Sequence, residues 1–487
     1  MTSIAARHPL APWTEALPRE WSLTRIDAVT DVLFSNVDKH TLDNEEPVRL
    51  CNYVDVYKND GITGSLDFME ASAEPREIKR FQIRRGDVLA TKDSETPDDI
   101  AISSLVADDL PGVLCGYHLA MMRPRSKRLH GPFLAWAHAS KQFRAQYEAR
   151  AVGVTRFGLS QYAFRSARIP LPPRPEQERI AEYLDASCAA IDAAVAAKRR
   201  QIESLNALLL STIQHAVTQG LDTKAMTRTS ALDWLPEIPS HWKVQQIKRR
   251  CDLLRGKFTH RPRNDPAYYD GHYPFVQTGE ITAADKYIRS YSQTLNELGL
   301  SVSKMFPRGT LVMSIAANVG DVAILDFAAC FPDSMVGLVP DHHTDLDYLY
   351  YLMRAMKGIL LRSAVLTTQL NLNYVRIGTN FAAFPPKQEQ EAIAAFLDAK
   401  TAEVRAIITV LYRQIETLIA VRKSLVHECV TGQRRVQDAL QPPLPDRPQA
   451  ERGETLPEGS GRQGAAERGL SRRRLDPVQG RSDAPNL

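Results

Sequence analysis

The stretch PPRPEQERIAEYLDA at residues 172–186 returns as PPKQEQEAIAAFLDA at residues 385–399. These copies belong to a longer repeat, because residues 172–220 align without gaps to residues 385–433 and 21 of the 49 positions are identical. A repeat has to be explained first, since overlooking one misassigns the whole fold. The chain is therefore expected to contain two copies of one structural unit.

Each copy predicts one long helix. Its prolines can stand only before or within the first helical turn, and the glutamates that follow suit the positive end of a helix. Apolar residues then recur at spacings of four and three over about four heptads, which indicates a coiled-coil seam. The seam positions are Ile180, Leu184, Cys188, Ile191, Val195, Lys198, Ile202, Leu205 and Leu209 in the first copy, and Ile393, Leu397, Thr401, Val404, Ile408, Leu411, Ile415 and Leu418 in the second.

Neither helix can bury its seam alone. A helix of about 40 residues is about 60 Å long, which exceeds the size of a small domain. Each copy needs a partner of the same length, and we expect the two copies to pair with each other.

The repeat extends upstream of both helices. LPREW (17–21) matches IPSHW (238–242), and RRGDVLA (84–90) resembles FPRGTLVMS (306–314). Short β-patterned runs with turn residues fill each half, so the fold class is α+β, twice over. The predicted units are globular domains at 13–170 and 222–383, long helices at 171–221 and 384–433, and a disordered tail at 434–487 that almost lacks large apolar groups.

Composition indicates a soluble, cytoplasmic, multidomain protein with no membrane partner. Apolar residues make up 44% and charged residues 24% of the 487 residues. The first thirty residues lack the apolar region of a signal peptide, and the most apolar stretch, 348–361, is broken by Arg354 and Lys357. Six scattered cysteines without a C-x-x-C pair are expected to be buried free thiols.

Positive charge is local rather than global. The formal net charge is only +4, yet residues 248–263 hold seven Lys or Arg against one Asp, and residues 123–128 hold four more. Such patches attract phosphate backbones, although a solvated basic face would look the same in sequence.

No credible catalytic set is present in the sequence. Asp265-Pro266-Ala267-Tyr268 is close to the D-P-P-Y motif of amino-methyltransferases, but Ala replaces the second proline and no glycine-rich cofactor loop accompanies it. The run from Asp341 to His343 is better interpreted as a surface turn than as a metal site. A phosphate-binding loop and a nuclease triad are both missing. We expect a non-catalytic chain with no metal or cofactor of its own.

The arrangement resembles the specificity subunit of type I restriction-modification systems. The resemblance covers residues 13–433 and includes the P-x-x-W domain openings, the two PPxxEQ helices, and the TQGL and TGQ segments after them. It implies two target recognition domains that each read one half of a bipartite site in double-stranded DNA. The two helices would form an antiparallel coiled coil that sets the unread spacer.

The resemblance also implies partners. Two methyltransferase subunits and two restriction/motor subunits would assemble on this chain. S-adenosylmethionine, ATP and Mg would then belong to those subunits, and the complex would have adenine methyltransferase and ATP-dependent endonuclease activities.

Loop residues between strands are the candidates for DNA contact. Arg and Lys can pair with guanine, Asn and Gln with adenine, and other polar groups can hold phosphates. The candidates are Lys92, Ser94, Thr96, Thr155, Arg156, Lys257, His260, Arg261, Arg263, Asn318, Gln369 and Asn371.

Two other functions remain open from the residues alone. A coiled-coil scaffold without a DNA role would explain the helices but not the paired basic loops. A stand-alone DNA methyltransferase would need the cofactor motifs that the sequence lacks. An electrophoretic shift with the co-expressed methyltransferase partner would separate the three hypotheses.

Overall fold

The structure is a computed structural model that describes residues 17–125, 127–316, 318–362 and 374–436. For 365–366 and 370–371 it describes the backbone only. Of the predicted disordered tail, 437–487 lie outside the described residues.

The first globular half combines strands with short helices. Its strands are β1 (Ser22–Arg25), β2 (Thr30–Phe34), β3 (Glu46–Cys51), β4 (Gly61–Ile62), β5 (Met69–Ala73), β6 (Val88–Thr91), β7 (Asp93–Ser94), β8 (Ser103–Val106), β9 (Val113–Cys115), β10 (Leu119–Pro124), β11 (Val152–Gly153), β12 (Phe157–Gly158) and β13 (Arg168–Leu171). Its α-helices are α2 (Tyr53–Lys58), α3 (Pro75–Phe81), α4 (Gly131–Ala139), α5 (Lys141–Glu148) and α6 (Gln161–Ser166).

The second globular half has a similar inventory. Its strands are β14 (Thr227–Leu232), β15 (Leu235–Pro239), β16 (Lys243–Gln246), β17 (Cys251–Arg255), β18 (Tyr269–Phe275), β19 (Tyr287–Ile288), β20 (Gln293–Leu295), β21 (Met305–Phe306), β22 (Leu311–Ser314), β23 (Val322–Leu325), β24 (Ala329–Cys330), β25 (Met335–Pro340), β26 (Val365–Leu366), β27 (Leu370–Asn371) and β28 (Phe381–Phe384). Its α-helices are α8 (Thr278–Ala283), α9 (Glu297–Ser301), α10 (Leu346–Arg362) and α11 (Tyr374–Thr379).

The two halves share one sheet topology. The main sheet runs β2-β10-β6-β8-β4 in the first half and β17-β25-β22-β23-β19 in the second. In both, the last pair is parallel and the other pairs are antiparallel. The central strands β6 and β22 are buried at every position, as expected of strands covered on both faces. The predicted repeated α+β fold is confirmed.

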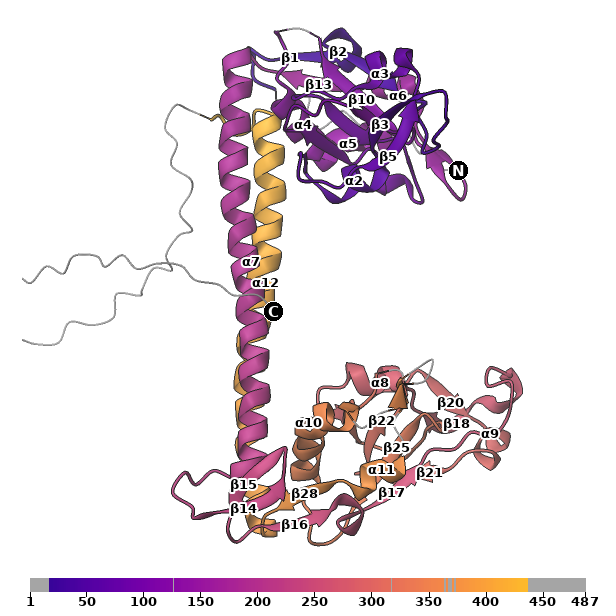
Figure 1. Cartoon of the computed structure of the whole chain (residues 1–487), viewed down its shortest axis with the longest axis vertical. Coiled ribbons are helices and arrows are strands. Elements are labelled where there is room, and N and C mark those ends of the chain that lie inside the picture. Colours follow the sequence, from indigo (N-terminus) through magenta and orange to yellow (C-terminus); the bar gives the residue numbers. More distant parts are fainter. Residues whose placement is uncertain are drawn as a thin grey trace, which may run out of the picture. The chain divides into compact units, whose positions relative to one another are not determined.

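The long helices α7 (Arg174–Gln219) and α12 (Lys387–Val430) contain 46 and 44 residues and run side by side (Figure 1). They are antiparallel, because the Lys198 Nζ atom donates to Gln414 Oε1 at 2.7 Å while Arg422, later in α12, reaches back to Asp192 at 3.1 Å. A central apolar cluster is formed by Val195, Ile202, Leu411 and Ile415. The predicted pairing through the heptad seam is confirmed, with Lys198 reaching out of the seam to a polar partner.

The repeated glutamate binds a tryptophan. The Trp21 Nε1 group donates to a Glu176 carboxylate oxygen at 3.0 Å, and Trp242 donates to Glu389 at the same distance. Both indole rings are buried. The P-x-x-W opening of each half is thereby fastened to the first turn of its own long helix.

The repeated glutamine fixes the preceding loop. Gln177 and Gln390 are fully buried, and each side-chain amide forms three hydrogen bonds with the backbone in front of its helix. The partners are Arg128 O, His130 N and Pro172 O for Gln177, and His343 O, Asp345 N and Pro385 O for Gln390. Satisfying buried backbone groups in this way explains why the sequence repeats Glu-Gln as a unit.

The end of each long helix packs against the other half. Gly220, with φ +77°, follows α7 and lies against Trp242, while Gly432, with φ +75°, follows α12 and lies against Trp21. A side chain at Gly432 would collide with Pro18 at 2.5 Å, so this close approach requires glycine. Each domain core thus includes the first turns of its own helix and the last turns of the other.

The structure also bears on the cysteines and on the question of a membrane span. All six cysteines are buried and free, as predicted. Across the part of the chain that the structure describes, no helix combines the length and the apolar character that a membrane span requires.

Candidate nucleic-acid interface

Two candidate loops of the first half meet in a small sheet. β7 pairs with β12, which also pairs with β11, and Ser94 stands opposite Phe157. This pairing brings the loop of Lys92, Ser94 and Thr96 next to the turn that carries Thr155 and Arg156. Five candidates, which form two groups about 60 positions apart in the sequence, therefore form one cluster in the structure.

Asp93 organises the charges of this cluster. Its carboxylate accepts from Arg156 Nη2 at 2.5 Å and lies 2.9 Å from His118 Nδ1. Burial raises the pKa of Asp93, but the hydrogen bonds from Arg156 and His118 outweigh burial and hold the pKa below its ordinary value. The Arg156 side chain is still 60% exposed, so this guanidinium keeps donors free for a ligand.

Aromatic rings, which the sequence analysis did not select, complete the cluster. The Lys92 Nζ atom lies 4.4 Å from the Tyr117 ring centroid and 5.5 Å from that of Phe34, close enough for cation–π attraction. Tyr53 and Tyr57 stack on α2, and Tyr117 is about half exposed. In the sequence, the adjacent rings of Tyr117 and His118 between two strands could have indicated this aromatic cluster.

The individual candidates of the first half differ in accessibility. Thr96, Thr155 and Arg156 are exposed and Lys92 is partly buried. Ser94 is buried, and its hydroxyl accepts from the Thr96 N–H at 3.4 Å. Ser94 thus shapes the loop, while the other four present groups at its surface.

The basic loop of the second half gathers around one carboxylate. Arg263 pairs with Asp333, and Arg261 reaches the same carboxylate at 3.4 Å. Both guanidinium groups are about half exposed, and Lys257 on the same loop is exposed as well. Asp333 lies two residues before β25, as Tyr117 lies two residues before β10, so the equivalent site has a different chemistry.

His260 belongs to the same loop and is partly buried. Its ring stacks on Tyr268 with centroids 3.9 Å apart, and its Nε2 atom lies 3.1 Å from Asp265. Asp265 also caps the turn by accepting from the Ala267 N–H. The residues that resembled a methyltransferase motif therefore form a capped turn whose carboxylate is already engaged.

The remaining candidates do not join this basic loop through a described contact. Asn318 lies in the turn between β22 and β23, where it donates to Thr282 at 2.8 Å. The backbone equivalent of Lys92 is the buried Ile315, because Lys92 N donates to His118 O and Ile315 N donates to Ser334 O. Asn371 is described by its backbone only, and Gln369 lies outside the described residues.

Comparison with known proteins identifies the family. A protein-family model described as the type I restriction modification DNA specificity domain matches residues 58–204 and 239–417, more than half of the chain. The chain belongs to this family. Each matched segment covers most of one half and part of the long helix that follows it, so the chain holds two DNA specificity domains.

Named relatives agree with this assignment, and a solved structure shares the fold. A putative type I restriction enzyme MjaX specificity subunit of Methanocaldococcus jannaschii is 22% identical, over 86% of this chain and 95% of its own length. The MjaVIII specificity subunit of the same organism is 20% identical over 87% and 95%. A chain from a structure concerning complex assembly and conformational transition of the type I restriction-modification system matches with a TM-score of 0.69 and 18% identity, over 86% and 99% of the two chains.

Within the described residues, no group of three His, Cys, Asp or Glu side chains is arranged to hold a metal ion. The clusters that do form combine exposed cations with aromatic rings or with one carboxylate. Such groups bind phosphates and base edges through charge and hydrogen bonds.

Proposed function

We propose that this chain is the specificity subunit of a type I restriction-modification complex, in which each globular domain reads one half of a bipartite site in double-stranded DNA. The proposal rests on the observation that the two domains share one sheet topology but present different side chains at their surfaces. The loops around the central strands present Lys92 and Arg156 in the first domain, but Arg261 and Arg263 in the second. Two readers of one shape and different side chains fit two different half-sites.

The helix pair supports the bipartite arrangement. Antiparallel helices with equivalent junctions relate the two domains by an approximate twofold axis, which matches the approximate dyad of DNA. The pair also gives the frame a fixed length, and we propose that this length sets the unread spacer.

The surface of the helix pair supports partner binding. Large apolar side chains are exposed along both helices, which a solvated coiled coil does not need. They include Leu208, Leu210, Ile407, Val410 and Tyr412. We propose that two methyltransferase subunits dock here and that two restriction/motor subunits complete the assembly. These partners would contribute S-adenosylmethionine, ATP and Mg, and this chain would be non-catalytic.

Co-expression with the cognate methyltransferase subunit tests the proposal. The complex should shift DNA in a sequence-dependent manner, and mapping of methylated bases in the host should return one site with two defined parts and a spacer. The chain alone should transfer no methyl group to DNA. A complex that binds all sequences equally, or a methylated motif without a spacer, would contradict the proposal.

A further inference from the structure

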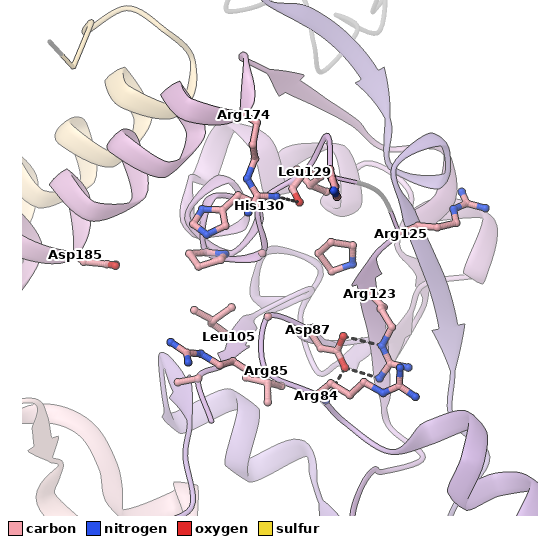
Figure 2. A pocket seen from close by; sticks show the side chains of 17 residues that line it. Arg84, Arg85, Asp87, Leu105, Arg123, Arg125, Leu129, His130, Arg174 and Asp185 are labelled. Carbon is pink, nitrogen blue, oxygen red and sulfur yellow. Dashed lines mark hydrogen bonds and ion pairs between the residues drawn. The ribbon is translucent and has the colours of Figure 1, made fainter. Parts of the chain in front are cut away.

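A basic pocket lies where the first domain meets the start of α7 (Figure 2). Its volume is about 880 Å³, and its walls come from the loop before β6, the end of β10 and the starts of α4 and α7. The cationic side chains that line it are Arg84, Arg85, Arg123, Arg125, Lys127 and Arg174, against the carboxylates of Asp87 and Asp185.

Three of the arginines already have structural partners. Arg123 pairs at 2.6 Å with Asp87, whose side chain is 2% exposed, so this charge is neutralised inside the wall. Arg174 bonds Leu129 O and Glu178. Arg125 bonds the backbone around β2.

Arg84 and Arg85 have no such role. Both are exposed, and among the described residues neither guanidinium has a hydrogen-bond or ion-pair partner. Figure 2 shows both side chains projecting from the loop that also carries Asp87. Two adjacent uncompensated arginines at the edge of a concave basic surface provide donors for an anion.

Among its described residues, the second domain does not repeat this unpaired arginine pair. Gly86 and Gly309 occupy equivalent turns, because each has positive φ and donates its N–H to the strand that follows in the sheet order. Arg84 and Arg85 therefore correspond to Pro307 and Arg308, and Arg308 is paired with Asp326 at 2.7 Å.

The wall and rim of the pocket change in the same way. The register of β10 and β25 places Val339 at the position of Arg123, and Asp341 follows at the position of Arg125. Two cations do recur in the second domain, because Arg308 and Lys387 occupy the positions of Arg85 and Arg174.

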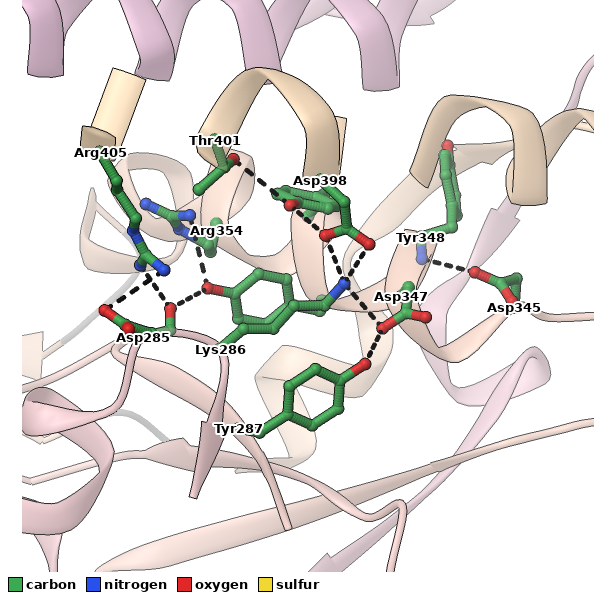
Figure 3. Close-up of polar contacts among 12 residues, drawn as sticks. Asp285, Lys286, Tyr287, Asp345, Asp347, Tyr348, Arg354, Asp398, Thr401 and Arg405 are labelled. Carbon is green, nitrogen blue, oxygen red and sulfur yellow. Dashed lines mark hydrogen bonds and ion pairs between the residues drawn. The ribbon is translucent and has the colours of Figure 1, made fainter. Parts of the chain in front are cut away.

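The charges around these two are compensated. Besides the Arg308–Asp326 pair, Asp398, the equivalent of Asp185, pairs with Lys286 at 2.6 Å (Figure 3). The same fold thus forms without the other cations, so their concentration in the first domain has another cause.

We propose that this pocket binds backbone phosphates of the DNA that the first domain reads, and that it gives this domain a sequence-independent anchor that the second domain lacks. The inference rests on the proposed function. β6 and β10 connect the pocket to the cluster of Lys92 and Tyr117 at their other ends. Arg85 and Lys92 are seven residues apart, which corresponds to about 23 Å of extended chain. This is shorter than one helical turn of DNA, about 34 Å, so one duplex can contact both ends.

The test compares a double variant with a matched control in the complex with the methyltransferase subunit. Arg84→Ala with Arg85→Ala should reduce the salt dependence of DNA binding, by about 0.9 in the slope of log K against log salt for each lost phosphate contact. Affinity should fall by the same factor for the cognate site and for a mismatched site, and the methylated sequence should not change. Arg308→Ala should leave the slope of log K against log salt unchanged. The variant with both Arg84→Lys and Arg85→Lys should retain most of the wild-type slope.

Each other result overturns the inference. An unchanged slope in the alanine variant would mean that no phosphate is bound there. Weaker methyltransferase assembly, with an unchanged slope for the complex that still forms at high subunit concentration, would assign the pocket to an acidic protein surface. A free ligand is indicated if inorganic phosphate or ATP raises the melting temperature of the wild type but not of the variant, again with an unchanged slope. If the wild-type complex showed no sequence preference, the proposed function would fail first, in the same assay.

Discussion

The Trp21–Glu176 hydrogen bond should contribute measurably to stability, and a double-mutant cycle isolates it. The variants are Trp21→Phe, Glu176→Ala and their combination, so the losses caused by truncating either side chain cancel. The donor is buried and the Glu176 side chain is 7% exposed. A hydrogen bond to a charged group contributes about 1.5–3 kcal/mol, and we expect a coupling free energy of unfolding in that range.

The Trp242–Glu389 pair provides the internal comparison. Its bond length is the same, and each carboxylate has a second partner, Arg435 for Glu176 and His241 for Glu389. The Glu389 side chain, however, is 30% exposed. The coupling there should be smaller, because water competes for the carboxylate. Urea unfolding followed by helical circular dichroism measures both cycles. A coupling below about 0.5 kcal/mol at Trp21–Glu176 lies within ordinary non-additivity and would show that packing alone holds this junction.

The remaining predictions concern the seam, a buried histidine and the modularity of the two halves. Ile202→Ala, which removes a side chain from the central cluster, should lower the unfolding free energy by about 2 kcal/mol or more, whereas Leu210→Ala at an exposed position should change it by less than about 0.5 kcal/mol; equal effects in urea titrations would refute the seam assignment. Burial lowers the pKa of His138 to about 4, so the unfolded chain binds the extra proton between about pH 4 and 6.5, and stability should rise with pH across that window by about 3 kcal/mol. His138→Gln should flatten that part of a pH series of unfolding midpoints, and an unaltered slope would exclude this histidine as its origin. Replacing residues 13–165 by the matching domain of a relative should alter one half-site in methylation maps; a change in both would mean that the domains do not read independently. A fragment ending at Leu221 should self-pair through its helix and specify a symmetric site, and a monomer in sedimentation would contradict this.

The sequence was sufficient to predict the two long helices and their pairing, because this part of the chain is repeated. Heptad spacing and the two PPxxEQ segments predicted α7, α12 and their pairing, since such periodicity directly reflects which face is buried. The glutamate and glutamine contacts could not be derived, because their partners are set by the tertiary fold; Trp21 and Glu176, for example, are 155 positions apart in sequence.

The sequence could predict which loops form the candidate interface, but not which of their residues are accessible. Exposed cations such as Arg156 and Arg261 can be selected from composition and turn signals. The burial of Ser94 depends on strand register, and so does the placement of Ile315 at the position equivalent to Lys92. A register shift of one residue would move these side chains to the opposite face of the sheet. The stacked tyrosines were missed because aromatic residues in short helices usually indicate a core.

The junctions have a consequence for connectivity. At one end of the helix pair the peptide link 220–226 joins α7 to the second domain, while at the other end residues 431–435 meet residues 18–21 with the same kind of packing and no peptide link. The peptide link therefore acts mainly by raising the local concentration of one half around the other, to about millimolar for a short connection. Two halves made as separate chains would still have complete mating surfaces, and the order in which one chain joins them is not dictated by the fold.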